Sequence, residues 1–166
     1  MADSATCLDA VIRPYERSHL ADVLQVWREA TRIAHPFLSD AFISQEAHAI
    51  RDKHLPAADT WVWETDGNVA GFLSLLGNEI GGLFVRPAAH RRGIGAALVD
   101  HALTLHRSLE VEVFARNEIG RAFYARRGFT LIGEGFDERA SEPVLRLQLV
   151  GPTVLPGTHQ RSDGRG

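Results

Sequence analysis

The sequence predicts an α/β protein in which a mixed, mostly antiparallel central sheet carries helices on both faces. Three observations support this fold class. Apolar residues recur at a helical spacing of three or four in some segments and form short, strand-like runs in others. Hairpin turns connect the first group of strands, whereas helices separate the later strands. The 166 residues suit one compact domain rather than two.

The N-terminal part is predicted to hold one strand and two helices. Residues 10–13 form a short strand that ends at a proline. Ser18 is a candidate N-cap for a helix with one apolar stripe that runs to Ala34. Pro36 stops this helix, because the residue before a proline avoids the helical region. A second helix is expected at about 44–55.

The rest of the chain is predicted to alternate between strands and helices. We expect strands at 60–64, 69–76, 80–85, 109–114, 129–132 and 144–149, and helices at 93–107 and 117–127. Asp66-Gly67-Asn68 is a hairpin turn, and Gly128 is expected to end the last helix as a left-handed cap. The element order is therefore β-α-α-β-β-β-α-β-α-β-β. We expect one domain over residues 1–150 and a disordered tail over 151–166, which is rich in Pro, Gly, Ser and Arg.

Composition excludes several classes of protein. The net charge of −3 gives no general basic field for nucleic acid. No apolar run approaches the roughly 20 residues of a membrane span, and the N-terminus does not resemble a secretory signal. Cys7, the single cysteine, cannot form an internal disulfide or a cysteine-based zinc site. We expect a cytoplasmic protein without a metal, membrane or nucleic-acid partner, and a monomer or homodimer.

The most informative segment runs from Gly82 to Val99. A buried strand leads through Pro87 and two arginines, Arg91 and Arg92, into Gly-x-Gly and an amphipathic helix. Free amides and a partial positive charge at a helix N-terminus attract anions, and glycine lets a ligand approach the backbone. The segment lacks the Gly-Lys-Ser/Thr of a Walker A loop and the third glycine of a Rossmann loop. It predicts a diphosphate-binding turn, although glycines needed only for turn geometry would leave the same pattern.

Three segments occur in a characteristic order. The first is the predicted hairpin at 61–72, the second is His90-Arg91-Arg92-Gly93-Ile94-Gly95, and the third runs from Asn117 through Phe123-Tyr124 to Gly128-Phe129. Together they resemble the GCN5-related N-acetyltransferases, the GNAT superfamily, over about residues 10–150. The second segment resembles the acetyl-CoA signature Arg/Gln-x-x-Gly-x-Gly/Ala, with histidine in the first position. The resemblance implies a small, GNAT-like α/β enzyme.

The resemblance also implies a role in binding acetyl-CoA for each matching residue. The backbone before the loop would pair with the pantetheine arm, and the loop and helix start would hold the diphosphate. Asn117 would bond to the cofactor arm, and Tyr124 would lie near the thioester sulfur. The implied cofactor-binding residues are Leu83, Phe84, Val85, Arg91, Arg92, Gly93, Ile94, Gly95, Ala96, Asn117 and Tyr124.

Tyr124 is a candidate general acid. Asn117, Arg121 and Tyr124 are spaced to share one helix face, so Tyr124 is expected to face the same cleft as Asn117. The ordinary pKa of a phenol lies about 1.5 units above that of a thiol, so full proton transfer to the leaving thiolate costs roughly 2 kcal/mol. A hydrogen bond from the phenol would also stabilise the developing negative sulfur. A packing tyrosine is the alternative.

The acceptor side is less defined by the sequence. A lysine-like amine must lose a proton before it attacks, and Glu79 is a candidate catalytic base for that step. A solvated strand-end carboxylate is the alternative for Glu79. His35 and Phe37 follow the first long helix, where the resembling family walls the acceptor site, and they are candidate substrate-binding residues. A histidine that caps the helix C-terminus is the alternative for His35.

These residues predict an acetyl-CoA-dependent N-acetyltransferase. The acceptor would be a primary amine of a small molecule, a peptide N-terminus or a lysine, and it would attack directly in a ternary complex. The alternative is a non-catalytic acyl-CoA-binding sensor or regulatory domain. That alternative needs the glycine loop but neither Tyr124 nor a proton route.

Overall fold

Seven strands form one sheet in the order β1-β2-β3-β4-β5-β7-β6 in a computed structural model that describes residues 10–152. The strands are β1 (Val11–Pro14), β2 (Asp59–Thr65), β3 (Asn68–Leu76), β4 (Glu79–Val85), β5 (Ser108–Phe114), β6 (Thr130–Asp137) and β7 (Glu142–Val150). Every neighbouring pair is antiparallel except β4 and β5. The expected mixed, mostly antiparallel sheet is confirmed, whereas Cys7 and nearly all of the expected tail lie outside the described residues.

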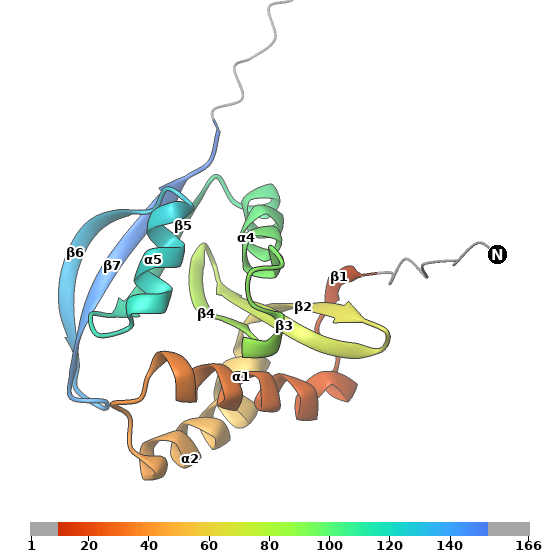
Figure 1. Cartoon of the computed structure of the whole chain (residues 1–166). Helices are drawn as coiled ribbons and strands as arrows, with labels where there is room; N and C mark the ends of the chain where they lie inside the picture. The colour runs from red at the N-terminus through yellow and green to blue at the C-terminus, as the bar shows by residue number, and fades with distance from the viewer. Residues whose placement is uncertain (1–9, 153–166) are drawn as a thin grey trace, which may run out of the picture.

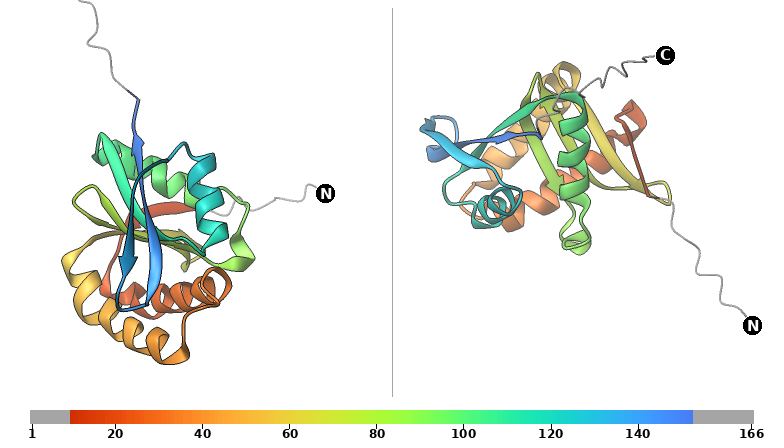
Figure 2. Two further views of the ribbon diagram at one scale, coloured as in Figure 1. Left: turned by 90° about the vertical axis from the view of Figure 1, so that its left-hand side faces the viewer. Right: turned by 90° about the horizontal axis from the view of Figure 1, so that it is seen from above.

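The helices cover both faces of this sheet (Figure 1). They are α1 (Leu20–Ala34), α2 (Asp40–Ala49), α3 (Leu55–Ala57), α4 (Ile94–Leu105) and α5 (Glu118–Arg126). Short 3₁₀ turns lie at Arg17–His19 and Pro87–Ala89, and a π-helical turn joins α2 to α3 at Ile50–His54. Figure 2 shows β6 and β7 at the opposite end of the sheet from β1.

Each face of the sheet has its own apolar core. On one face, the fully buried Val23 of α1 belongs to the same cluster as Val62 and Phe72 of the sheet. On the other face, Leu98 of α4 packs in a cluster with Leu73. Burying each such side chain contributes about 1.5–3 kcal/mol, so the two cores hold the helices firmly against the strands.

Several boundaries differ from those expected, and three of them have a clear structural reason. Ser18 does not cap α1, because it lies within a 3₁₀ turn that precedes the helix. The second long helix begins at Asp40 rather than near 44, because the hydroxyl of Ser39 accepts a hydrogen bond from the amide of Phe42 (3.1 Å). β6 continues to Asp137 rather than 132, since its pairing with β7 extends to the connecting turn.

Candidate active site

The parallel pair β4 and β5 separates after only two residues of pairing. Glu79 lies opposite Glu110 and Ile80 opposite Val111, although each strand has seven residues. On the other side of β4, the register with β3 shifts at Gly81, which leaves this glycine as the extra residue of a β-bulge. A bulge bends its strand and interrupts pairing. The main-chain edge of residues 81–85 that faces β5 is therefore unpaired, and we call it the open edge.

Leu83, Phe84 and Val85, the predicted partners of a pantetheine arm, all lie on the open edge. The amide of Arg86 donates to the carbonyl of Ala70, so alternation along β4 turns the main-chain groups of Phe84 toward β3. Those of Leu83 and Val85 face β5 and remain available to a ligand. An extended amide-containing chain can add to such an edge as another strand would. The geometry therefore fits the part of coenzyme A that contains two amide bonds.

The predicted phosphate loop continues directly from the open edge into α4. Arg91 and Gly93 both adopt left-handed backbone conformations, with φ of 66° and 77°, and Gly93 is the N-cap of α4 without a side-chain cap. Successive backbone amides in a turn of this kind point to one side and form a concave anion site. The amides of Ile94, Gly95 and Ala96 have no carbonyl partner within the helix, so they remain available as donors. The exposed side chains of Arg91 and Arg92 add positive charge there.

Glycine is required at the two loop positions for different structural reasons. Gly93 needs its positive φ, whereas a Cβ on Gly95 would lie 3.1 Å from the ring of Phe123 on α5. Gly95 thus lets α4 and α5 approach closely. His90, which replaces the arginine or glutamine of the signature, donates a hydrogen bond from Nε2 to the carbonyl of Val85 (3.0 Å). It therefore ties the loop back to the end of β4.

Helix α5 carries the two other predicted cofactor residues. Asn117 is its N-cap, and the Oδ1 atom accepts from the amide of Gly120 (2.8 Å). Tyr124 is buried on the side of α5 that faces the core, between the rings of Phe123 and Phe129. Burial raises the pKa of the Tyr124 phenol, so this hydroxyl stays protonated and acts as a hydrogen-bond donor.

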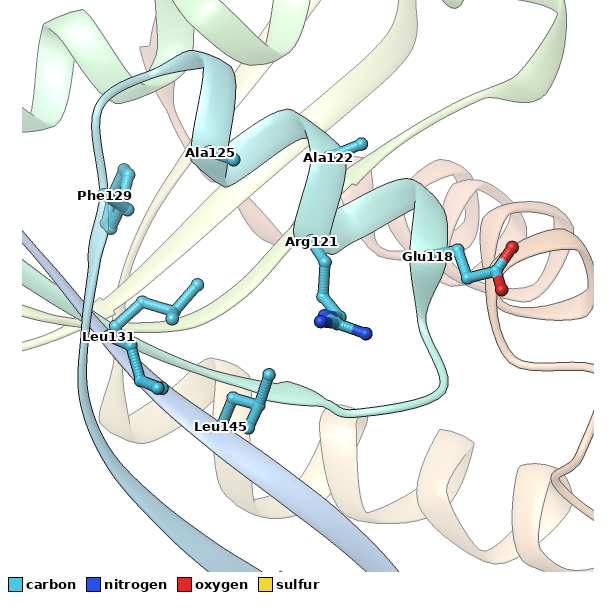
Figure 3. Close-up of a pocket in the computed structure, with 8 residues that line it drawn as sticks. Glu118, Arg121, Ala122, Ala125, Phe129, Leu131 and Leu145 are labelled. Carbon is cyan, nitrogen blue, oxygen red and sulfur yellow. The ribbon is translucent and has the colours of Figure 1, made fainter.

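Arg121 does not share the face of Tyr124, which corrects our expectation. Its side chain lies on the outer face of α5, where a cavity of about 420 Å³ separates the helix from β6 and β7. Figure 3 shows Arg121, Ala122 and Ala125 on one side of this cavity and Leu131 and Leu145 on the other. None of the predicted cofactor-binding residues lines it.

The structure brings His35 and Phe37 to the start of α5. Nε2 of His35 lies 3.0 Å from Nδ2 of Asn117, and both residues are buried. The rings of His35, Phe37 and Phe114 pack together, with centroids 5.0 to 5.7 Å apart. His35 ends α1 through its backbone, but its side chain does not cap that helix. Burial lowers the pKa of His35 to about 4, so the ring is neutral.

Glu79 lies apart from this aromatic group, at the closed end of the β4–β5 pair. Its carboxylate contacts Nη2 of Arg146 on β7 (3.3 Å) and is 40% exposed. Glu110 is its neighbour across the sheet. The structure thus places Glu79 on the strand of the open edge, with access to water.

Two residues near the site were not singled out from the sequence. Phe114 packs against His35, and alternation along β5 sets it on the face opposite to the buried Val111 and Val113, a signal that the sequence contained. Arg116 lies 4.6 Å from the ring centroid of Phe37 and pairs with the buried Glu142 (2.7 Å). No local pattern in the sequence indicated these contacts of Arg116.

Comparison with known proteins identifies the family. A profile described as "Acetyltransferase (GNAT) family" matches residues 20–129. The chain belongs to the GNAT acetyltransferase family. It is 35% identical over 134 residues to "Peptidyl-lysine N-acetyltransferase YiaC" of Escherichia coli K12, and the aligned region covers 80% of this chain and 92% of that protein. It is 34% identical to "Peptidyl-lysine N-acetyltransferase YjaB" of Salmonella typhimurium LT2 over 78% of this chain and 90% of that protein.

Solved structures support the same fold. The solution structure of apo YjaB from Escherichia coli superposes with a TM-score of 0.78 at 28% identity, over 87% of this chain and all of that one. PaiA N-acetyltransferase from Thermoplasma acidophilum, solved with coenzyme A, has a TM-score of 0.69 at 19% identity, over 84% of this chain and 98% of that one. The second likeness concerns the fold alone.

The family settles the enzyme class that the sequence predicted. This protein is an N-acetyltransferase, acetyl-CoA is its acetyl donor, and an amine is the acceptor. No helix within residues 10–152 is both long and apolar enough to cross a membrane. Over the same range, no three His, Cys, Asp or Glu side chains gather as a metal site would require.

Proposed function

We propose that this protein acetylates the ε-amine of lysine side chains in proteins or peptides. The observation that supports this acceptor class most strongly is the similarity to two proteins named peptidyl-lysine N-acetyltransferases, each covered over at least 90% of its length. Residues 1–150 would act as one catalytic domain, as a monomer or homodimer in the cytoplasm. The net charge of −3 argues against a nucleic-acid partner.

The donor site would be built from the open edge, the phosphate loop and the start of α5. Main-chain groups of Leu83 and Val85 would pair with the pantetheine arm, while those of Phe84 between them stay bonded to β3. Asn117 would bond to the same arm with its remaining amide hydrogen, because its other groups are already paired. The diphosphate would be held by the loop residues Arg91, Arg92, Gly93, Ile94, Gly95 and Ala96.

Tyr124 would stabilise the leaving group as a hydrogen-bond donor. Acetyl-CoA supplies an activated thioester, whose C–S bond breaks as the lysine nitrogen forms a bond to the carbonyl carbon. The electron pair of the broken bond stays on sulfur. Because burial raises the pKa of Tyr124, complete proton transfer to sulfur costs more than the sequence suggested. A hydrogen bond in an apolar site stabilises the thiolate without that transfer.

Glu79 would take the proton that the amine must lose. A lysine with its ordinary pKa of about 10.4 is neutral in roughly one molecule in 250 at pH 8, so a base raises the reactive fraction. Glu79 is exposed enough to work through water, and Arg146 holds its carboxylate. His35 is not placed to take this proton, because its Nε2 atom already accepts a hydrogen bond from Asn117. His35 and Phe37 would instead wall the acceptor side.

Thiol release measured with acetyl-CoA and a panel of amines tests this function. The panel would contain a lysine peptide, the same peptide with lysine replaced by arginine, a peptide with only a free N-terminus, and a polyamine. We expect turnover with the lysine peptide and a mass increase of one acetyl group on its ε-amine. Turnover with the polyamine alone would refute the proposed acceptor. Tight binding of acetyl-CoA without turnover on any amine would favour the sensor alternative.

A further inference from the structure

A buried hydrogen bond joins the end of α1 to the start of α5. His35 is the residue that follows α1, and Asn117 is the N-cap of α5, 82 positions later in the chain. The two side chains are 9% and 8% exposed, and the bond between them is 3.0 Å long. The acceptor-side connection and the helix of Tyr124 therefore meet at this pair.

The direction of the bond follows from the other partner of Asn117. Its Oδ1 atom accepts from the amide of Gly120, so Nδ2 is the atom that faces His35. An amide nitrogen only donates, so Nε2 of His35 must accept and the ring proton lies on Nδ1. The lowered pKa of about 4 keeps the ring in this neutral form. Nε2 is thus already used, and the ring cannot take up a proton there without breaking the bond.

The surroundings hold this pair in one arrangement. The His35 ring is packed at 5.0 Å from Phe114 and 5.7 Å from Phe37. Asn117 is fixed from the other side by its cap to Gly120. Without the acceptor on His35, a buried N–H of Asn117 would lose its partner, and buried polar groups without partners are costly.

We propose that His35 is a positioning residue for acetyl transfer, acting through Asn117 to fix the N-terminus of α5 and thereby the placement of Tyr124. This inference rests on the proposed function. Tyr124 lies seven residues beyond Asn117, about 10 Å along the helix, so a tilt of about 6° at the cap moves it by about 1 Å. A misplacement of about 1 Å in an active site lowers the rate by up to about a hundredfold. Asn117 would also lose its orientation toward the cofactor.

Two substitutions of the same residue separate positioning from packing. His35→Phe keeps an aromatic ring beside Phe37 and Phe114 but removes the acceptor. His35→Gln gives up the ring but offers an amide oxygen near the place of Nε2. We expect His35→Phe to lower kcat by about tenfold or more and to weaken acetyl-CoA binding, whereas His35→Gln stays within about threefold of wild type in both. Calorimetry with acetyl-CoA and steady-state kinetics with a lysine peptide measure these effects.

A nuclear magnetic resonance readout reports on the bond itself. The side-chain amide of Asn117 should shift in His35→Phe and stay close to its wild-type position in His35→Gln. A purely structural role for His35 would lower thermal stability in both variants without restoring kcat in the glutamine variant. A role as general base would abolish turnover in both variants and remove the acidic limb of the kcat–pH profile.

The proposal is overturned if His35→Phe keeps the wild-type kcat and acetyl-CoA affinity, or if His35→Gln is as defective as His35→Phe. These results are distinct from failure of the proposed function. If the wild-type protein acetylates no lysine peptide, the proposed acceptor is wrong. The Asn117 amide signal and the acetyl-CoA affinity still decide the positioning role, and unchanged values in His35→Phe overturn it.

Discussion

Acid should lower the free energy of unfolding of this protein, because the buried His35 ring is neutral in the folded state and protonated in the unfolded chain. Burial lowers the folded-state pKa of His35 to about 4 from its ordinary value of 6.5, so the unfolded chain binds more protons between these values. The contribution of the neutral His35 ring to the free energy of unfolding is therefore fully present above pH 6.5 and is lost as the pH falls toward 4. Between about pH 7.5 and pH 5 the loss from this residue is about 2 kcal/mol, which corresponds to a fall of about 4–8 °C in melting temperature.

Urea denaturation of wild type and His35→Gln at the two pH values isolates this effect. Other groups titrate in both proteins, so their contributions cancel in the difference between wild type and variant. We expect wild type to lose about 2 kcal/mol more than His35→Gln on acidification. His48→Gln, which removes an exposed histidine of α2, is the matched control. Equal losses in wild type and His35→Gln would refute the argument, because the ring would then not be held neutral by burial.

Three other substitutions have defined outcomes. Tyr124→Phe should lower kcat by about a hundredfold, while calorimetry finds the affinity for acetyl-CoA unchanged. A normal kcat would show that the Tyr124 hydroxyl does not take part in the reaction. Gly93→Ala and Gly67→Ala both place a side chain at a positive φ in open space and should each cost about 1–2 kcal/mol in denaturation experiments. Only Gly93→Ala should weaken acetyl-CoA binding, and equal affinities would contradict the assigned diphosphate site. Ser39→Ala should remove the cap on the Phe42 amide and cost about 1 kcal/mol in urea denaturation, with kcat preserved, whereas an unchanged stability would refute the cap.

Periodicity and turn chemistry were enough to predict most of the fold. The strands beside the Asp66-Gly67 turn follow from alternation, and the end of α1 follows from Pro36, because these signals are local. Ser18 misled because a serine can cap a helix only where the backbone before the helix is extended, and here it lies inside a 3₁₀ turn. Ser39, followed by Asp40, was a readable cap that the apolar spacing further along obscured.

The site was predictable only in part. The glycine loop carries its conformational demands in its own residues, as the positive φ of Gly93 shows. The open edge depends on a bulge at Gly81 and on which strands become neighbours, and neither is written in local spacing. The bond between His35 and Asn117 joins residues 82 positions apart, so no periodic pattern could reveal it. The prediction that Arg121 and Tyr124 share one face of the helix was wrong. Two residues that are three apart point in somewhat different directions around the helix axis, which is enough to put Tyr124 in the core and Arg121 on the solvent side.

A crystal structure of this protein with acetyl-CoA tests the central claim most directly. We predict that the diphosphate contacts amides between Arg91 and Ala96, that the pantetheine arm pairs with the open edge of β4, and that the thioester sulfur lies within hydrogen-bonding reach of the Tyr124 hydroxyl. A diphosphate bound away from the start of α4, or a sulfur far from Tyr124, would contradict the assignment of these residues.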